Sequence, residues 1–117
     1  MIELKLADRQ FVFNDDSYAN YYEYFICVIN QEIVGLLQFE IDTPSLTDIE
    51  FIEEHDTFIN KDSLTRASLN YMLVHDYRSC MLNSEQFRFF IDKYADKNVF
   101  DNNFIDLEKF FSLGCAH

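Results

Sequence analysis

The middle of this sequence lacks positive charge. Residues 10–60 contain eleven Asp and Glu but no Lys or Arg, so this stretch carries −11 of the formal net charge of −12. Proteins that bind nucleic acid use clustered Lys and Arg to neutralise phosphates, and binding to an anionic membrane surface requires the same residues. We therefore expect no direct contact with nucleic acid and no attachment to a membrane surface.

Residues that turn or break a chain are scarce, and long apolar runs are absent. The 117 residues include two Gly, one Pro and no Trp, which predicts long elements with short connections. No run approaches the roughly 18 to 20 apolar residues of a membrane-spanning helix. Met1 is followed by IELKLADRQ, which differs from a basic and then apolar leader, so we expect a cytoplasmic protein.

Cysteine is also sparse. Cys27, Cys80 and Cys115 are an odd number at wide spacing, which favours reduced thiols over a disulfide framework. Large apolar side chains, in contrast, are plentiful. With 49% hydrophobic residues, including 13 Phe and 7 Tyr, the chain can bury one packed core, and we expect residues 1–117 to form a single domain.

The first half of the sequence has the patterns of β-strands. IELKL alternates apolar and polar residues, and FVF fits a second short strand. YFICVIN and EIVGLLQFEID are separated by Asn30 and Gln31, which predicts an antiparallel hairpin. In TDIEF, strand alternation places Asp48 and Glu50 on the same face.

The second half has the patterns of helices. Asp62 or Ser63 is a candidate cap for one helix, Asn83 with Gln86 resembles the capping box of another, and residues 101–103 are expected to start a third. These patterns predict an α+β fold. Its antiparallel sheet has four to five strands from the N-terminal half, and three helices from the C-terminal half pack on one face.

The chemically reactive residues do not form a pattern that indicates a particular reaction. His55 lies in EEHD, but adjacent residues of a strand point to opposite faces, so these side chains are not expected to converge on a metal. His75 with Cys80, and Cys115 with His117, are residue types of zinc and thiol sites, yet the chain lacks a C-x2-C pair. We predict no catalytic residue, no metal site and no cofactor.

Two stretches resemble a family of enzymes. CVINQEIVGLLQFE followed by LTDIEFIEEHDTF and a helix is similar to the middle of the GNAT N-acetyltransferases, and NSEQFRFFIDKY resembles the later Asn-led helix of that family. The resemblance covers about half the chain. It implies a hairpin, a strand and a helix whose Gly-rich start binds the acetyl-CoA pyrophosphate through backbone N–H groups. Here that start reads INKDSLTR, with Asp62 and Leu64 in place of glycines, so the resemblance implies a degenerate acyltransferase fold.

Composition and size give a different resemblance. The acidic chain is similar to bacterial immunity proteins and to phage-encoded nuclease inhibitors that imitate DNA. This resemblance implies a non-catalytic monomer or weak homodimer that neutralises a basic protein partner, such as a nuclease toxin, by covering its nucleic-acid-binding surface. The alternatives are the degenerate acyltransferase and an oligomerising structural module. The predicted partner-binding residues are Asp15, Asp16, Tyr18, Tyr21, Tyr22, Glu23, Glu40, Asp42, Asp48, Glu50, Glu53, Glu54 and Asp56.

Overall fold

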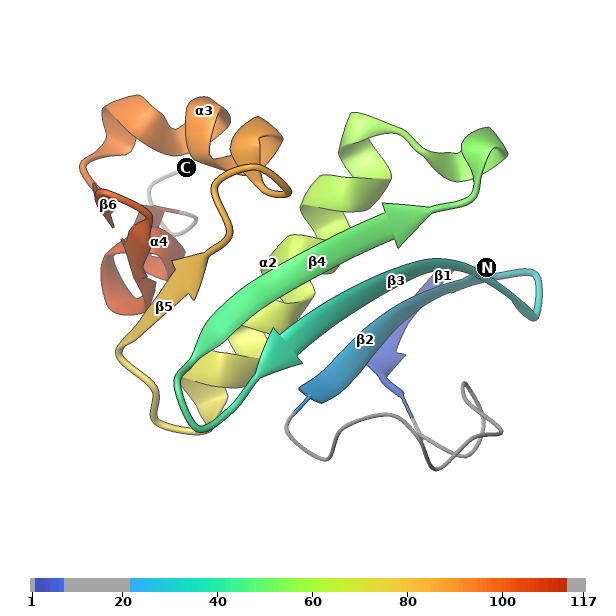
Figure 1. The fold of residues 1–117 in the computed structure, drawn as a ribbon, viewed down its shortest axis with the longest axis horizontal. Coiled ribbons are helices and arrows are strands. Elements are labelled where there is room, and N and C mark those ends of the chain that lie inside the picture. Colours follow the sequence, from blue (N-terminus) through green and yellow to red (C-terminus); the bar gives the residue numbers. More distant parts are fainter. Residues whose placement is uncertain (1, 8–21, 114–117) are drawn as a thin grey trace.

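The structure, a computed structural model, describes residues 2–7 and 22–113, with residue 22 described by its backbone alone. The expected FVF strand lies outside the described residues. Figure 1 shows a single sheet with helices behind it. The strands are β1 (Ile2–Leu6), β2 (Tyr22–Ile29), β3 (Glu32–Glu40), β4 (Ser45–Phe51), β5 (Ser79–Leu82), β6 (Phe100–Asp101) and β7 (Phe104–Asp106). The helices are α2 (Phe58–Val74), α3 (Arg88–Tyr94) and α4 (Leu107–Leu113), and the short 3-10 turns are η1 (Glu53–His55) and η2 (Ala95–Lys97).

The seven strands are arranged in the order β1-β2-β3-β4-β5-β7-β6. All neighbours are antiparallel except β4 and β5, which run parallel. Parallel neighbours need a crossover connection, and α2 supplies it. The α+β class is therefore confirmed, but the sheet is mixed and larger than the expected four to five antiparallel strands.

The hairpin in the first half is confirmed. Ile29 pairs with Glu32, so Asn30 and Gln31 alone form the loop between β2 and β3. Both loop residues have positive φ angles, 51° and 72°. Two-residue loops with this left-handed backbone match the twist of the flanking strands, which is why they join hairpins.

The expectation that the second half is purely helical is wrong. SCML forms β5, where Cys80 and Leu82 are buried while Ser79 and Met81 are exposed. A strand this short gives too little periodicity to be separated from a helix by its pattern. Residues 100–106 form the hairpin of β6 and β7, so the last helix starts at Leu107 and not at residues 101–103.

The start of α2 also differs from the prediction. Thr57 is the cap, because its side chain accepts a hydrogen bond from the backbone N–H of Asn60, and the helix begins at Phe58. Asp62 lies inside the helix and is only 7% exposed. Its carboxylate accepts a hydrogen bond from the Tyr94 hydroxyl at 3.2 Å and lies 3.7 Å from the Lys93 ammonium. Asp62 thus connects α2 to α3 instead of capping a helix.

Most of the core lies between the helices and one face of the sheet, while Tyr24 and Ile26 of β2 are buried on the other face. The ring of Tyr71 on α2 lies 5.3 Å from that of Phe25 and 5.8 Å from that of Phe39, both on the sheet. Phe90 on α3 and Phe110 on α4 are buried in the same cluster, with their rings 5.4 Å apart. None of the helices in residues 2–7 and 22–113 has both the length and the apolar character to cross a membrane.

Gly35 and Phe51 form a close contact at the last residue of β4. They are cross-strand partners on β3 and β4, and the Phe51 ring lies over the glycine. A Cβ atom placed on Gly35 would overlap this ring. An aromatic ring that covers a glycine in the neighbouring strand compensates for the missing side chain.

We predict that Gly35→Ala lowers the free energy of unfolding by about 1–3 kcal/mol, because the new methyl group displaces the Phe51 ring. In a Phe51→Ala background, the same substitution should change stability by less than about 1 kcal/mol, since the space is then free. Urea unfolding of the four proteins in this double-mutant cycle measures the coupling. Equal effects of Gly35→Ala in both backgrounds would contradict the contact.

Candidate functional site

The face of the sheet opposite α2 carries acidic residues at the centre of the sheet. Asp48 pairs with Gln38, and Glu50 pairs with Leu36. Residues two apart in a strand project on the same side, and directly paired residues share a face. Asp48 and Glu50 therefore project on the same side as their partners Gln38 and Leu36, as strand alternation predicts. Ile49, between them, points to the opposite face of the sheet, where it is buried in the core on the side of α2.

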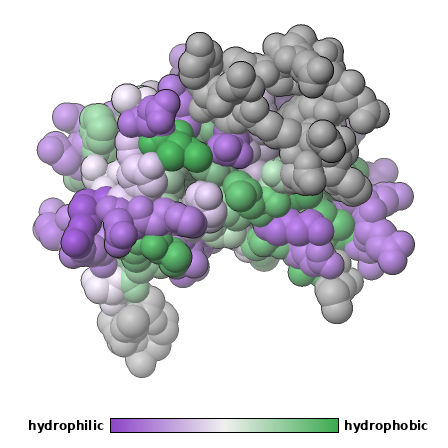
Figure 2. Space-filling model, turned by 90° about the horizontal axis from the view of Figure 1, so that it is seen from below, coloured by the Kyte–Doolittle hydropathy of each residue, from purple (hydrophilic) through white to green (hydrophobic). Residues whose placement is uncertain are grey.

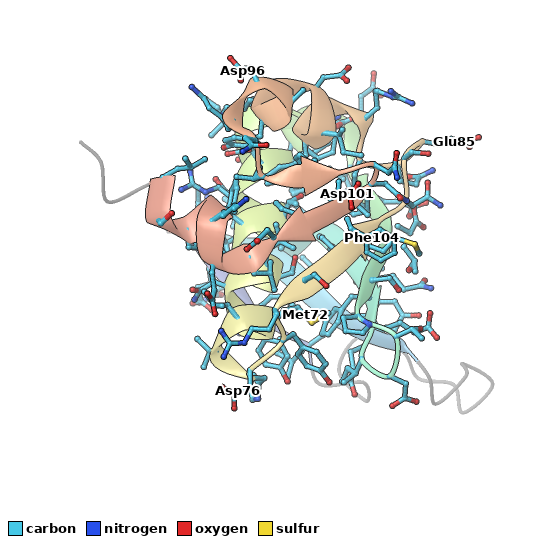
Figure 3. All side chains as sticks on the ribbon, turned by 90° about the vertical axis from the view of Figure 1, so that its left-hand side faces the viewer. Met72, Asp76, Glu85, Asp96, Asp101 and Phe104 are labelled. Carbon is cyan, nitrogen blue, oxygen red and sulfur yellow. The ribbon has the colours of Figure 1, made fainter. Side chains whose placement is uncertain are left out.

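The same face continues across the second half of the sheet with exposed apolar residues. Met81 pairs with Ser45 and Phe104, and Phe104 pairs with Asp101. Met81 is 37% exposed and Phe104 is 48% exposed. Figure 3 shows Phe104, Asp101 and Glu85 on the side of the sheet away from α2. We call this surface the open face, and it consists of Asp48, Glu50, Met81, Asp101 and Phe104.

Positive charge is segregated from this surface. None of the strands β2 to β7 contains Lys or Arg. Apart from Lys5 and Arg78, the described cations lie on helical segments: Lys61, Arg66, Arg88, Lys93, Lys97 and Lys109. The two layers of the fold therefore differ in charge, with acids on the sheet and cations mainly on the helices.

Figure 2, an edge view, shows hydrophilic and hydrophobic residues interspersed, with small hydrophobic areas between hydrophilic ones.

A hollow lies beside the end of β4. β4 and β5 pair only at Ser45 with Met81 and Leu46 with Leu82, and the strands then part. The hollow has a volume of about 530 Å³. Its lining residues are Ile33, Val34, Gly35, Leu36, Ile49, Glu50, Phe51, Ile52, Asp56, Lys61, Glu85 and Gln86.

The charges of the hollow do not cancel. It is lined by the carboxylates of Glu50, Asp56 and Glu85 and by one ammonium group, that of Lys61. Lys61 lies 3.4 Å from Asp56, and its ammonium is 4.9 Å from the centre of the Phe89 ring. Two carboxylates thus remain in excess, and a cation is the ligand that this hollow favours.

The predicted partner-binding residues fall into separate groups. Glu50, Glu53, Glu54 and Asp56 lie together along the end of β4 and η1. Glu40 and Asp42 lie at the opposite end of β4, beside its first residue. Glu23 pairs with Phe39 and so belongs to the face that carries the core. Outside the described residues lie Asp15, Asp16, Tyr18 and Tyr21, together with the side chain of Tyr22.

Sequence reasoning missed one residue of the hollow, Glu85, and three residues of the open face. Glu85 lies in the turn NSEQ, where the Asn83 side chain accepts hydrogen bonds from the N–H groups of Glu85 and Gln86. Met81 was missed because residues 79–82 were assigned to no element, and Asp101 and Phe104 because they were expected at the start of a helix. Only their pairing across β5, β7 and β6 brings them to one face.

The thiol and imidazole candidates lie elsewhere. Cys80 is 1% exposed and faces the core, and burial raises the pKa of its thiol to about 12. Burial also raises the pKa of Cys27. The His75 ring lies 4.2 Å from the Tyr71 ring at the end of α2. Within the described ranges, no three His, Cys, Asp or Glu side chains converge as a metal site.

Comparison with known proteins gives no family assignment. No protein-family model and no curated protein matches this sequence.

The raised pKa values predict unreactive thiols, because the thiolate is the form that attacks disulfides and alkylating reagents. At mildly alkaline pH, below the pKa of about 12, Cys80 is protonated as well as buried. Native protein should therefore leave Cys27 and Cys80 unmodified by iodoacetamide, and urea should expose both. Mass-spectrometric peptide mapping measures this, and rapid native labelling of Cys80 would contradict its placement.

Proposed function

We propose that this protein is a non-catalytic acidic binding protein that neutralises a basic protein partner. The function that fits best is that of an immunity protein or inhibitor, which covers the nucleic-acid-binding surface of a toxin or nuclease. The observation that carries the proposal is the charge segregation: strands β2 to β7 contain no Lys or Arg, and their open face carries Asp48, Glu50 and Asp101.

The acids of this surface are available for an external cation. Of the predicted partner-binding acids in the described ranges, Asp56 alone forms an ion pair, with Lys61. Glu50, Glu53 and Glu54 are exposed. Carboxylates held this way repel one another, and that repulsion decreases when a positively charged surface covers them.

The apolar residues of the open face support a protein partner over a small cation. Protein interfaces have an apolar centre and a polar rim. Met81 and Phe104 are exposed cross-strand neighbours, and Asp101 lies beside Phe104. A partner that covers this surface buries the two apolar side chains while its Lys and Arg face the surrounding acids. Electrostatic attraction of this kind raises association rates to about 10⁸–10⁹ M⁻¹s⁻¹.

We predict that a pull-down from cells of the source organism captures a basic protein, and that raising the NaCl concentration weakens its binding. Reversal of two acids, Glu50→Lys with Glu53→Lys, should slow association about tenfold, because steering depends on the summed charge near the site. Binding kinetics on a biosensor chip measure both effects.

The matched control is Asp92→Lys with Asp96→Lys, which makes the same change in net charge on α3 and η2. All four substituted residues are exposed, so neither double variant should unfold the protein. The control should slow association much less than the reversal at β4. Equal slowing by the two variants would show that net charge alone, and not this surface, attracts the partner.

A second candidate is a degenerate acyltransferase of the GNAT type, and one observation favours it. The β2–β3 hairpin, β4 and α2 follow one another in the order that the sequence resemblance implies. The start of α2 opposes that activity, because Glu53, Glu54 and Asp56 precede the helix where a pyrophosphate would need to approach. These carboxylates and the phosphates of a pyrophosphate are both negatively charged and repel one another.

Ligand-dependent melting separates the two candidates. A ligand that binds only the folded state raises the melting temperature. We expect millimolar acetyl-CoA to leave the melting temperature unchanged, and a rise of several degrees would favour the acyltransferase. Coenzyme A without the acetyl group serves as the control, since it carries the same phosphates.

A further inference from the structure

The edge of β4 that faces the hollow is unpaired beyond Leu46. Pairing with β5 ends there, and the N–H of Asn83 donates to the Leu46 carbonyl at 2.9 Å as the last bond of this seam. On the other side, β4 stays paired with β3 as far as Phe51. One edge of this central strand is therefore free over its second half.

The hydrogen-bonding groups on this free edge follow from the pairing with β3. The Ile52 N–H donates to the Val34 carbonyl at 2.9 Å, so Ile52 and Glu50 point their backbone groups toward β3. Backbone groups of a strand alternate in direction, so those of Ile49 and Phe51 point toward the hollow. Both residues line it.

One of these groups already has a substitute partner. The Asp48 carboxylate accepts a hydrogen bond from the Ile49 N–H at 2.9 Å. Across the described ranges, the N–H and carbonyl of Phe51 and the carbonyl of Ile49 have no protein partner on this side. An unpaired strand edge is a template for an extended chain, and charged side chains such as Asp48 are how proteins protect such edges from unspecific pairing.

We propose that the hollow receives an extended basic segment of the partner, which adds to the free edge of β4 and places a Lys or Arg among Glu50, Asp56 and Glu85. This inference rests on the proposed function and names the part of the partner that is held. Backbone hydrogen bonds to Phe51 and Ile49 supply affinity, and the side-chain position selects charge.

Charge complementarity decides which extended segment fits. The hollow has two carboxylates in excess, and its apolar lining includes Ile33, Leu36 and Ile52. Alternate residues of an added strand face opposite sides. A segment that alternates basic and apolar residues would direct its cations to the carboxylates and its apolar side chains along the strand surface.

The test uses the full chain, labelled with ¹⁵N, and a short blocked peptide of alternating Lys and Val. We expect the peptide to shift the Phe51 amide resonance and to slow its hydrogen exchange about tenfold, because the amide becomes hydrogen-bonded. An analogue with N-methyl groups on the pairing edge should bind at least about tenfold more weakly. A peptide with Glu in place of Lys should not bind.

Substitution of the hollow supplies the matched comparison. Glu50→Gln with Glu85→Gln should weaken the peptide about tenfold, whereas Asp92→Asn with Asp96→Asn, on the helical side, should leave its affinity unchanged. If spermidine protects the Phe51 amide as well as the peptide does, or if the N-methyl analogue binds equally well, the strand-addition inference is overturned in favour of a small-cation site.

The two proposals fail in different ways. If the peptide leaves the Phe51 amide unchanged while the captured partner still depends on Glu50 and Glu53, the strand-addition inference is wrong and the proposed function stands. If no basic partner responds to those charges, the proposed function is wrong, and with it the inference that rests on it.

Discussion

The short contact between β4 and β5 is the constraint on which the rest of the structure depends. The two strands share only Ser45 with Met81 and Leu46 with Leu82. This contact joins an antiparallel sheet from the first half to a small sheet from the second half, and α2 covers the seam from behind, where Leu64 and Leu69 are fully buried. Because the strands part after two residues, one edge of a central strand is exposed. The hollow and its unpaired backbone groups both follow from that separation.

The charge distribution follows the same division into layers. Helical segments hold six of the eight described cations, and several form ion pairs there, as Lys93 does with the buried Asp62 of α2. Arg78 pairs with Glu108 of α4, and Arg88 lies 4.0 Å from Asp92 within α3. These cations neutralise acids of the helical layer, and the ion pairs of the described residues leave Asp48, Glu50 and Asp101 of the open face without a cation. The negative surface is thus produced as much by where the cations are bound as by the number of carboxylates.

Much of the first half could be predicted from the sequence, because IELKL and TDIEF alternate apolar and polar residues and the Asn30–Gln31 turn separates two long apolar runs. The second half could not, since β5, β6 and β7 have only four, two and three residues. Such short strands exist because neighbours pair with them, as Ile105 does with Cys80 and Phe100, and no local pattern encodes that pairing. The cap of α2 was misplaced for a related reason. Asp62 looks like a capping residue, but its partner Tyr94 lies 32 positions away.

The acidic turn before α2 bears on the choice of ligand. A helix N-terminus carries partial positive charge, and the carboxylates of Glu53, Glu54 and Asp56 precede the start of α2 at Phe58. Elsewhere, that same helix end is a site for phosphate. Here Thr57 caps α2, and the carboxylates of Glu53, Glu54 and Asp56 that precede the cap repel an incoming anion. The acidic turn before α2 therefore opposes anionic ligands and leaves the hollow beside it to a cation.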